Sequence, residues 1–180
     1  MDGVGEVLTL LAGQFNSRVR EINDRGHVAG MTFDTASGKS NGAVWRDGTQ
    51  YVLAAGPGLE DAATRGIDNS GDTVIGFAHR VGGTAEAPIF DTQGQLWRWN
   101  GAGYEHFYLD TLVVNLNGWS TDAAQSINDR GQIVGFGIAP DGQQRAYLLS
   151  LVPEPVTWGL MIGGFGMVGA AMRRSRAVAA

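Results

Sequence analysis

A short motif recurs three times along the chain, and this recurrence limits the fold more than any other feature of the sequence. The motif consists of isoleucine, two Asx residues, one variable residue and glycine, and its isoleucines are Ile22, Ile67 and Ile127. The spacings between them are 45 and 60 residues. Periods of this length are typical of stacked supersecondary units. We therefore expect residues 1–150 to form one β-repeat domain of three similar units.

Within each unit the local signals indicate β-structure. The Asx-Asx-x-Gly stretches favour turns, because Asx side chains bond their own backbone and glycine accepts a positive φ. Asp47-Gly48 and Asn100-Gly101 each separate two strand-like runs and predict tight hairpins. Each unit thus supplies about four short antiparallel strands, as propeller blades do. The predicted fold is all-β and propeller-blade-like, and three units fall short of the four to eight blades of ordinary propellers.

The C-terminal tail predicts one transmembrane helix. Residues 156–172 carry no charge, and a helix of these 17 residues spans about 25 Å, close to the thickness of a bilayer's hydrocarbon core. Arg173, Arg174 and Arg176 follow at once, and such a basic stop marks the cytoplasmic end of a helix. We expect a proline-rich linker at 151–155 and a transmembrane helix with a basic tail at 156–180.

The tail glycines allow two further interpretations. Gly164, Gly166 and Gly169 have the GxGxxG spacing of a dinucleotide-binding loop, but that loop needs an acidic residue about 20 residues onward, and none follows. Gly159 and Gly163 have the small-residue spacing that lets membrane helices pack closely. A buried core helix of similar length is the remaining alternative.

The tail resembles a PEP-CTERM sorting signal of the type with a tryptophan after the second proline. Pro153, Glu154 and Pro155 form the proline-glutamate-proline motif, Trp158 follows three residues later, and the apolar stretch and arginines complete the pattern. The resemblance implies processing by exosortase, a membrane-embedded protease or transpeptidase of Gram-negative envelopes, with the three motif residues as its recognition element. Related tails are sometimes labelled as ice-binding protein C-terminal domains, but no threonine ladder is visible here.

The repeated motif resembles the HAF family of extracellular repeats. Their units read roughly Ile-Asn-Asp-x-Gly-x-Val-x-Gly, followed by a strand of His-Ala-Phe type. The first half is matched in all three units, whereas the second half is weak and its histidine is absent. The resemblance implies a repeat architecture and a location outside the cytoplasm, without an assigned activity.

Charge and composition exclude several classes of protein. Residues 1–152 carry 17 acidic and 10 basic residues, and this acidic body argues against nucleic-acid binding. Cysteine is absent, which removes disulfides and a cysteine nucleophile. The N-terminal residues include Asp2 and Glu6 and have no basic region, so they do not resemble a secretory signal. We expect either a truncated or misassigned start, or a first half-unit that completes the last unit by ring closure.

Candidate sites in the body are few. The three histidines, His27, His79 and His106, show no metal-ligand spacing and are expected at exposed strand or loop positions, so no metal site is predicted. No cofactor is expected, with calcium as the one alternative. Asp24, Asp68 and Asp129 lie in the repeated turns and could bind a calcium ion together. The tryptophans at strand positions are expected in the core, namely Trp45, Trp97, Trp99 and Trp119. Because Trp97 and Trp99 share one strand face, a small carbohydrate platform is the alternative for these two. No catalytic residues stand out.

These observations favour a non-enzymatic, exported repeat protein of the cell envelope or extracellular matrix in a Gram-negative bacterium. Its body would lie outside the inner membrane, anchored in lipid by the C-terminal helix until exosortase processes it. The alternative is a cell-surface module that binds polysaccharide, including the cell's own exopolysaccharide or biofilm matrix. A secreted hydrolase is the third interpretation, disfavoured because no acid/base pair stands out.

Overall fold

The protein was analysed as a computed structural model, which describes residues 5, 7–83 and 88–150. The chain divides into two units, residues 1–150 and 151–180, and every described residue belongs to the first. The sorting motif, the predicted transmembrane helix and the basic stop therefore lie outside the described residues. Within the part of the chain that is described, no helix is long and apolar enough to cross a bilayer.

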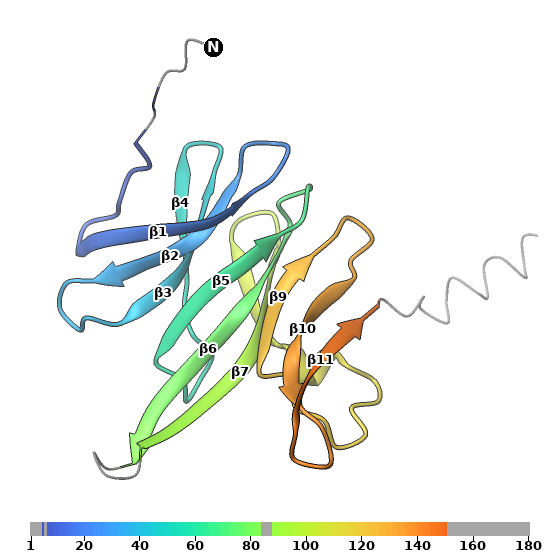
Figure 1. Cartoon of the computed structure of the whole chain (residues 1–180). Helices are drawn as coiled ribbons and strands as arrows, with labels where there is room; N and C mark the ends of the chain where they lie inside the picture. The colour runs from blue at the N-terminus through green and yellow to red at the C-terminus, as the bar shows by residue number, and fades with distance from the viewer. Residues whose placement is uncertain (1–4, 6, 84–87, 151–180) are drawn as a thin grey trace, which may run out of the picture. The chain divides into compact units, whose positions relative to one another are not determined.

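The described residues are mostly β-structure in three antiparallel sheets, which confirms this part of the predicted fold (Figure 1). Each sheet follows the chain order of its strands, and one short helix, α1 (Leu109–Leu112), follows the second sheet. The first sheet contains β1 (Gln14–Ile22), β2 (Val28–Asp34), β3 (Ser40–Arg46) and β4 (Thr49–Leu53). The second contains β5 (Asp61–Ile67), β6 (Thr73–Gly83), β7 (Pro88–Trp99) and β8 (Tyr104–Tyr108). The third contains β9 (Ala123–Ile127), β10 (Ile133–Ile138) and β11 (Gln144–Leu149).

Each repeated motif forms the turn between the first two strands of a sheet. The motif isoleucines are the last residues of β1, β5 and β9. In the first turn the Asn23 side chain accepts hydrogen bonds from the backbone of Arg25 and His27, at 3.0 and 2.9 Å. The turn closes through Gly26, whose φ of 78° is strained for other residues. The side chains of Asp68 and Asn128 accept equivalent bonds in the other two turns.

The predicted hairpins are also present. Asp47 and Gly48 connect β3 to β4 with φ values of 51° and 75°, the left-handed conformation that a two-residue hairpin needs. Asn100 and Gly101 lie in the connection of β7 to β8. The longer spacing between the second and third motifs has two sources. The paired strands β6 and β7 are 11 and 12 residues long, and α1 with its following loop is inserted before β9.

The core lies between successive sheets. The first core cluster combines residues of the first and second sheets, with Val44 and Trp97 at its centre. The second cluster joins the second sheet to the third through Leu96 and Ile127. Neighbouring residues of β7 thus face different cores, because side chains alternate between the two faces of a strand. The second sheet is covered on both faces by this arrangement.

Candidate binding site

A β-bulge occurs at the same repeat position in all three sheets. On β1 the pairing passes from Val19 opposite Gly30 to Glu21 opposite Ala29, so one residue is left over. The equivalent irregularities lie between Thr64 and Gly66 on β5 and between the partners of Val134 and Gly135 on β9. A bulge redirects the side chain of its extra residue. The three extra residues are Arg20, Arg65 and Gln125.

A glycine on the neighbouring strand makes each bulge possible. A Cβ on Gly30, Gly76 or Gly135 would lie 2.1 Å from a backbone carbonyl oxygen of the first strand, far inside van der Waals contact. The carbonyls belong to Arg18, Ala63 and Ala123, respectively. The second strand of each unit therefore needs a glycine at this position, because the backbones of the first and second strands approach too closely for a side chain.

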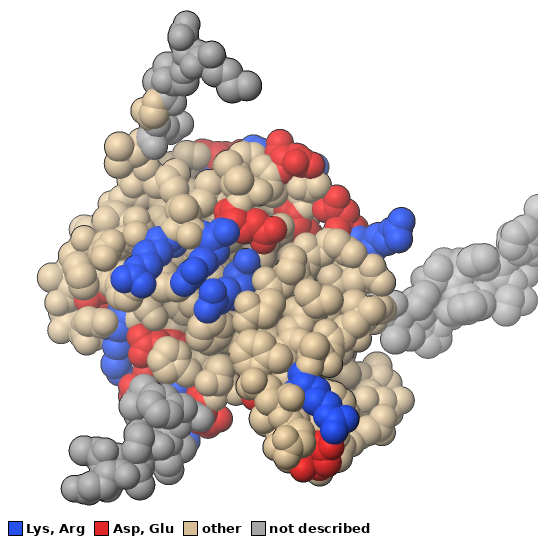
Figure 2. All heavy atoms as spheres, viewed as in Figure 1, with Lys and Arg blue, Asp and Glu red and all other residues tan. Residues whose placement is uncertain are grey.

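The bulges place arginines along the first strands. Figure 2 shows basic side chains gathered over the region of β1 and β5. Arg18 stacks on Phe33 and Arg65 stacks on Phe77, with guanidinium-to-ring distances of 5.5 and 5.0 Å. Arg18, Arg20 and Arg65 form no ion pair with any other described residue. We call these three residues the arginine row.

Arg65 is the most constrained member of the arginine row. Its Nε is buried and has no hydrogen-bond partner among the described residues. Burial lowers the pKa of Arg65, and the positive charge of Arg20 lowers it further. The group nevertheless remains charged at neutral pH, as arginine does in proteins. A buried Nε without a partner, on a partly exposed arginine beside a second arginine, favours an anionic partner, because an anion would satisfy the donor and reduce the repulsion.

A pocket of about 630 Å³ opens beside Arg65, between the second and third sheets. Two bulge residues, Arg65 and Gln125, lie in its wall together with the aromatic rings of Phe77 and Phe136. Asp91 and Asp122 lie on the same wall and bring negative charge. We call this cavity the bulge pocket. Aromatic faces combined with guanidinium, amide and carboxylate groups suit a polar ligand such as a sugar chain.

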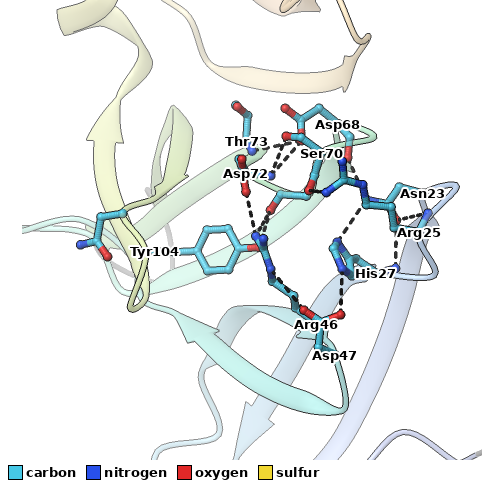
Figure 3. A network of polar contacts seen from close by, with 12 residues as sticks. Asn23, Arg25, His27, Arg46, Asp47, Asp68, Ser70, Asp72, Thr73 and Tyr104 are labelled. Atoms are coloured by element: carbon cyan, nitrogen blue, oxygen red, sulfur yellow. Dashed lines mark hydrogen bonds and ion pairs between the residues drawn. The ribbon is translucent and has the colours of Figure 1, made fainter.

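Polar side chains also connect the first and second sheets (Figure 3). Arg46 donates to Asp72 at 2.9 Å and to the carbonyl of Gly71 at 3.0 Å. The hydroxyl of Tyr104 donates to the same carbonyl at 2.6 Å. Burial raises the pKa of Tyr104, although the Arg46 charge opposes this rise. The network joins the two sheets and leaves these polar groups satisfied.

His27 belongs to the same network, and its expected exposure is wrong. It is 4% exposed because the Gly71 backbone of the next turn covers its ring. Its Nδ1 lies 3.4 Å from the Asn23 amide and its Nε2 lies 3.4 Å from Asp47. The Ser70 hydroxyl donates to Asp68 at 2.9 Å. His79 and His106 are half-buried.

The repeated turns do meet, as the calcium hypothesis requires, but an amide occupies their centre. The side-chain nitrogen of Asn69 donates to carboxylate oxygens of Asp24 and Asp129, at 2.8 Å each. Asp68 instead bonds within its own turn. Calcium sites need several oxygen ligands that converge on one point. No group of three or more potential metal ligands is found in the described part of the chain.

The two candidate tryptophans have different surroundings. Trp97 is 1% exposed and donates from its indole nitrogen to the Ala54 carbonyl at 3.3 Å. Trp99 is half-buried, and the Arg46 guanidinium lies 4.5 Å from its ring centre. The expected core position of Trp97 is confirmed, and the alternative of a two-tryptophan platform is wrong, because packing against the first sheet removes Trp97 from solvent. The arginine row and the bulge pocket were missed, although arginine precedes the motif isoleucine by two positions in two of the three units.

The fold and the site define a β-protein built from three repeated antiparallel sheets with a basic, partly aromatic surface. Comparisons with protein-family models, with curated proteins and with solved structures find no match for this chain.

Proposed function

We propose that this protein is an exported, non-enzymatic repeat protein of the cell envelope or extracellular matrix, with its three sheets as consecutive propeller-like blades. The observation that supports the blade assignment is the burial of two motif isoleucines between successive sheets. Ile67 and Ile127 are 3% and 8% exposed, and each lies in a core cluster shared with the preceding sheet. Successive antiparallel sheets pack face to face in this way in propellers.

The tail supports the export and sorting part of the proposal. The motif Pro153–Glu154–Pro155, an apolar stretch and a basic stop follow the β-domain in the order of a PEP-CTERM signal. Proline disfavours a helix at its own and the preceding position, and this sequence property suits a recognition element for a membrane protease. An exosortase-type enzyme is the proposed partner, and lipid surrounds the apolar stretch before processing.

Intact mass tests this assignment directly. The native protein is recovered separately from the envelope and from the culture medium of its source cells, and both samples are weighed by mass spectrometry. A chain that ends near residues 153–155 supports sorting by cleavage. An envelope-bound chain that retains Arg173 to Ala180 contradicts it and makes the tail a permanent anchor.

A second candidate function, binding of an acidic polysaccharide, is favoured by the unpaired Arg65 Nε in the wall of the bulge pocket. Carboxylated sugars combine an anionic group for the arginine row with apolar ring faces for Phe77 and Phe136. Long-range attraction to a polyanion is opposed by the overall charge of −5, so specific contacts at the row must carry the binding.

The test compares polygalacturonate with neutral dextran in affinity electrophoresis of the full chain. Arg20→Gln with Arg65→Gln should weaken the polygalacturonate retardation about tenfold or more, since charge-assisted bonds to carboxylates are lost. Arg98→Gln is the matched control, because Arg98 also stacks on a phenylalanine, Phe107, but lies outside the row. Equal retardation of both variants would contradict the assignment.

The remaining alternative, a secreted hydrolase, has its own discriminating measurement. A purified full-length sample is assayed against a broad panel of glycosides and esters. Turnover that survives purification and is lost in Asp91→Asn or Asp122→Asn would replace the binding proposal with a catalytic one, because these carboxylates line the bulge pocket.

A further inference from the structure

The first and third sheets each expose one apolar face. The equivalent faces of the other sheets are buried. On the first face, Ile22 and Val19 are 66% and 57% exposed. Their equivalents in the second sheet, Ile67 and Thr64, are 3% and 0% exposed, because the first sheet covers them. The third sheet shows the same burial at Ile127. The leading face of the first sheet, defined by Val19 and Ile22, is therefore not covered by any sheet of the described residues, although the repeat geometry calls for one.

The third sheet, at the other end of the domain, exposes its opposite face. Val134 and Leu148 pair across β10 and β11 and are 43% and 62% exposed. The equivalent pair in the second sheet, Ile75 and Leu96, is 0% and 4% exposed under the third sheet. Ala29 and Val44 of the first sheet are both 0% exposed. The trailing face of the third sheet, defined by Val134 and Leu148, is thus an apolar surface that no sheet of the described residues covers.

The two exposed faces are complementary, because their equivalents pack against each other within the chain. Within the chain, a trailing face packs on a leading face twice, in the core clusters that contain Val44 with Ile67 and Leu96 with Ile127. By repeat equivalence, Leu148 of one copy would contact Ile22 of another in the same manner. The three described sheets are too few to close into a ring by themselves, whereas those of two copies supply six blades, within the usual range of four to eight.

The N-terminal segment fits the same arrangement. The indole nitrogen of Trp45 donates to the Thr9 carbonyl at 2.8 Å, as that of Trp97 donates to Ala54. Ala54 directly follows β4, the fourth strand of its sheet, so Thr9 lies where a preceding fourth strand would end. The third sheet has only three described strands and ends at β11. By repeat equivalence Leu8 corresponds to Leu53, the last residue of β4, and would pair with the third sheet of a neighbouring copy.

We propose that two copies of this chain associate head to tail into a closed six-bladed ring, in which the trailing face of each third sheet covers the leading face of the other copy's first sheet. The proposal rests on the blade assignment above but not on sorting or on polysaccharide binding. Closure by a two-fold axis uses both exposed faces of both copies and leaves no open end.

Mass measurement of the full chain in detergent micelles tests the ring. We expect a dimer, and we expect Ile22→Glu or Leu148→Lys alone to raise its dissociation constant about 30-fold or more, since each places a charge at the centre of an apolar interface. Both side chains are exposed in the single chain, so neither substitution should unfold it. The double variant Ile22→Glu with Leu148→Lys should recover the dimer, because each interface then joins opposite charges.

Two controls separate this interface from other contacts. Val114→Glu alters another exposed aliphatic residue, 80% exposed, and should leave the mass unchanged. Gly159→Leu with Gly163→Leu should also leave the dimer intact, because the β-domain and not the tail holds it. A monomer, an open polymer, or a dimer that responds to the tail variant and not to Ile22→Glu would overturn the proposal.

Cross-linking tests the strand exchange separately, and the chain contains no native cysteine to interfere. Leu53 pairs with Gly42 in the first sheet, and Ala146 is the repeat equivalent of Gly42. The ring thus places Leu8 of one copy opposite Ala146 of the other. Leu8→Cys with Ala146→Cys should oxidise to a covalent dimer, since opposed strand residues are within disulfide reach. An oxidised product that remains monomeric would overturn the exchange.

Discussion

Gly71 lies directly against the ring of His27: a methyl group on Gly71 would sit 2.1 Å from His27 Nδ1. The contact joins the second repeated turn to the start of β2 in the first sheet. Neither residue has a special role within its own turn that the other turns lack. The meeting of two turns 45 residues apart in sequence is what makes His27 a buried residue.

Replacement of Gly71 by alanine should therefore destabilise the domain by about 3 kcal/mol, through positive-φ strain together with overlap on the His27 ring. Gly48→Ala is the matched control, because both glycines have a φ of 75° and Gly48 has no neighbour within 4 Å of the added carbon. The control should cost about 1 kcal/mol. Urea unfolding of both variants measures the difference, and equal midpoints would show that the ring of His27 moves aside.

The bulge glycines make a second prediction. Gly76→Ala should cost about 3 kcal/mol or more, because the new carbon meets the Ala63 carbonyl oxygen and neither backbone can shift without loss of the sheet's pairing. Gly103→Ala, where nothing lies within 4 Å, should change the free energy of unfolding by less than about 1 kcal/mol. Thermal unfolding followed by circular dichroism gives both values. A small effect at Gly76 would mean that the bulge is not required.

The amide of Asn69 makes a third prediction. Asn69→Asp would remove both donated bonds and leave three carboxylates together in place of Asp24, Asn69 and Asp129. We expect a loss of about 1–2 kcal/mol at low ionic strength, and we expect millimolar calcium to restore the stability of the variant while leaving the native protein unchanged. Asn115→Asp, at an exposed loop position, is the control and should show neither effect. Calcium-dependent stabilisation of the native protein would instead indicate a metal site that the amide does not block.

Acid should weaken the fold through His106. Burial lowers the pKa of His106 below its ordinary value of 6.5, and the ring is bonded to the Gln95 side chain. The unfolded chain therefore takes up the proton first as the pH falls, and this contribution to stability is present above about pH 6.5 and is lost on acidification. Urea midpoints between about pH 8 and 5.5, above the range where most carboxylates titrate, should fall for the native protein.

His106→Gln supplies the comparison for this pH dependence. Its urea midpoint should fall less over the same interval, because the group that titrates differently in the two states has been removed. Parallel pH profiles for the native protein and the variant would contradict the assignment of this acid sensitivity to His106.

The turns and hairpins of this chain could be predicted from the sequence. The repeated motif predicted three β-units, and Asp47-Gly48 predicted a hairpin, because turns and hairpins depend on residues close together in the chain. The positions of Gly30, Gly76 and Gly135 were visible as part of the pattern. The reason for these glycines could not be predicted. In a sequence, a glycine that makes room for a carbonyl of another strand cannot be distinguished from one that makes a turn.

Tertiary structure decided which of the repeated residues are buried and which groups meet. Ile22 and Ile67 occupy the same place in the motif, yet one is 66% and the other 3% exposed, because only the second has a sheet in front of it. The alternative role of Trp97 in a carbohydrate platform is excluded for the same reason, because the first sheet covers it. The approach of Arg65 to Arg20 depends on two bulges and on the stacking of separate sheets. Burial and charge proximity are properties of packed neighbours, and the motif alone does not specify those neighbours.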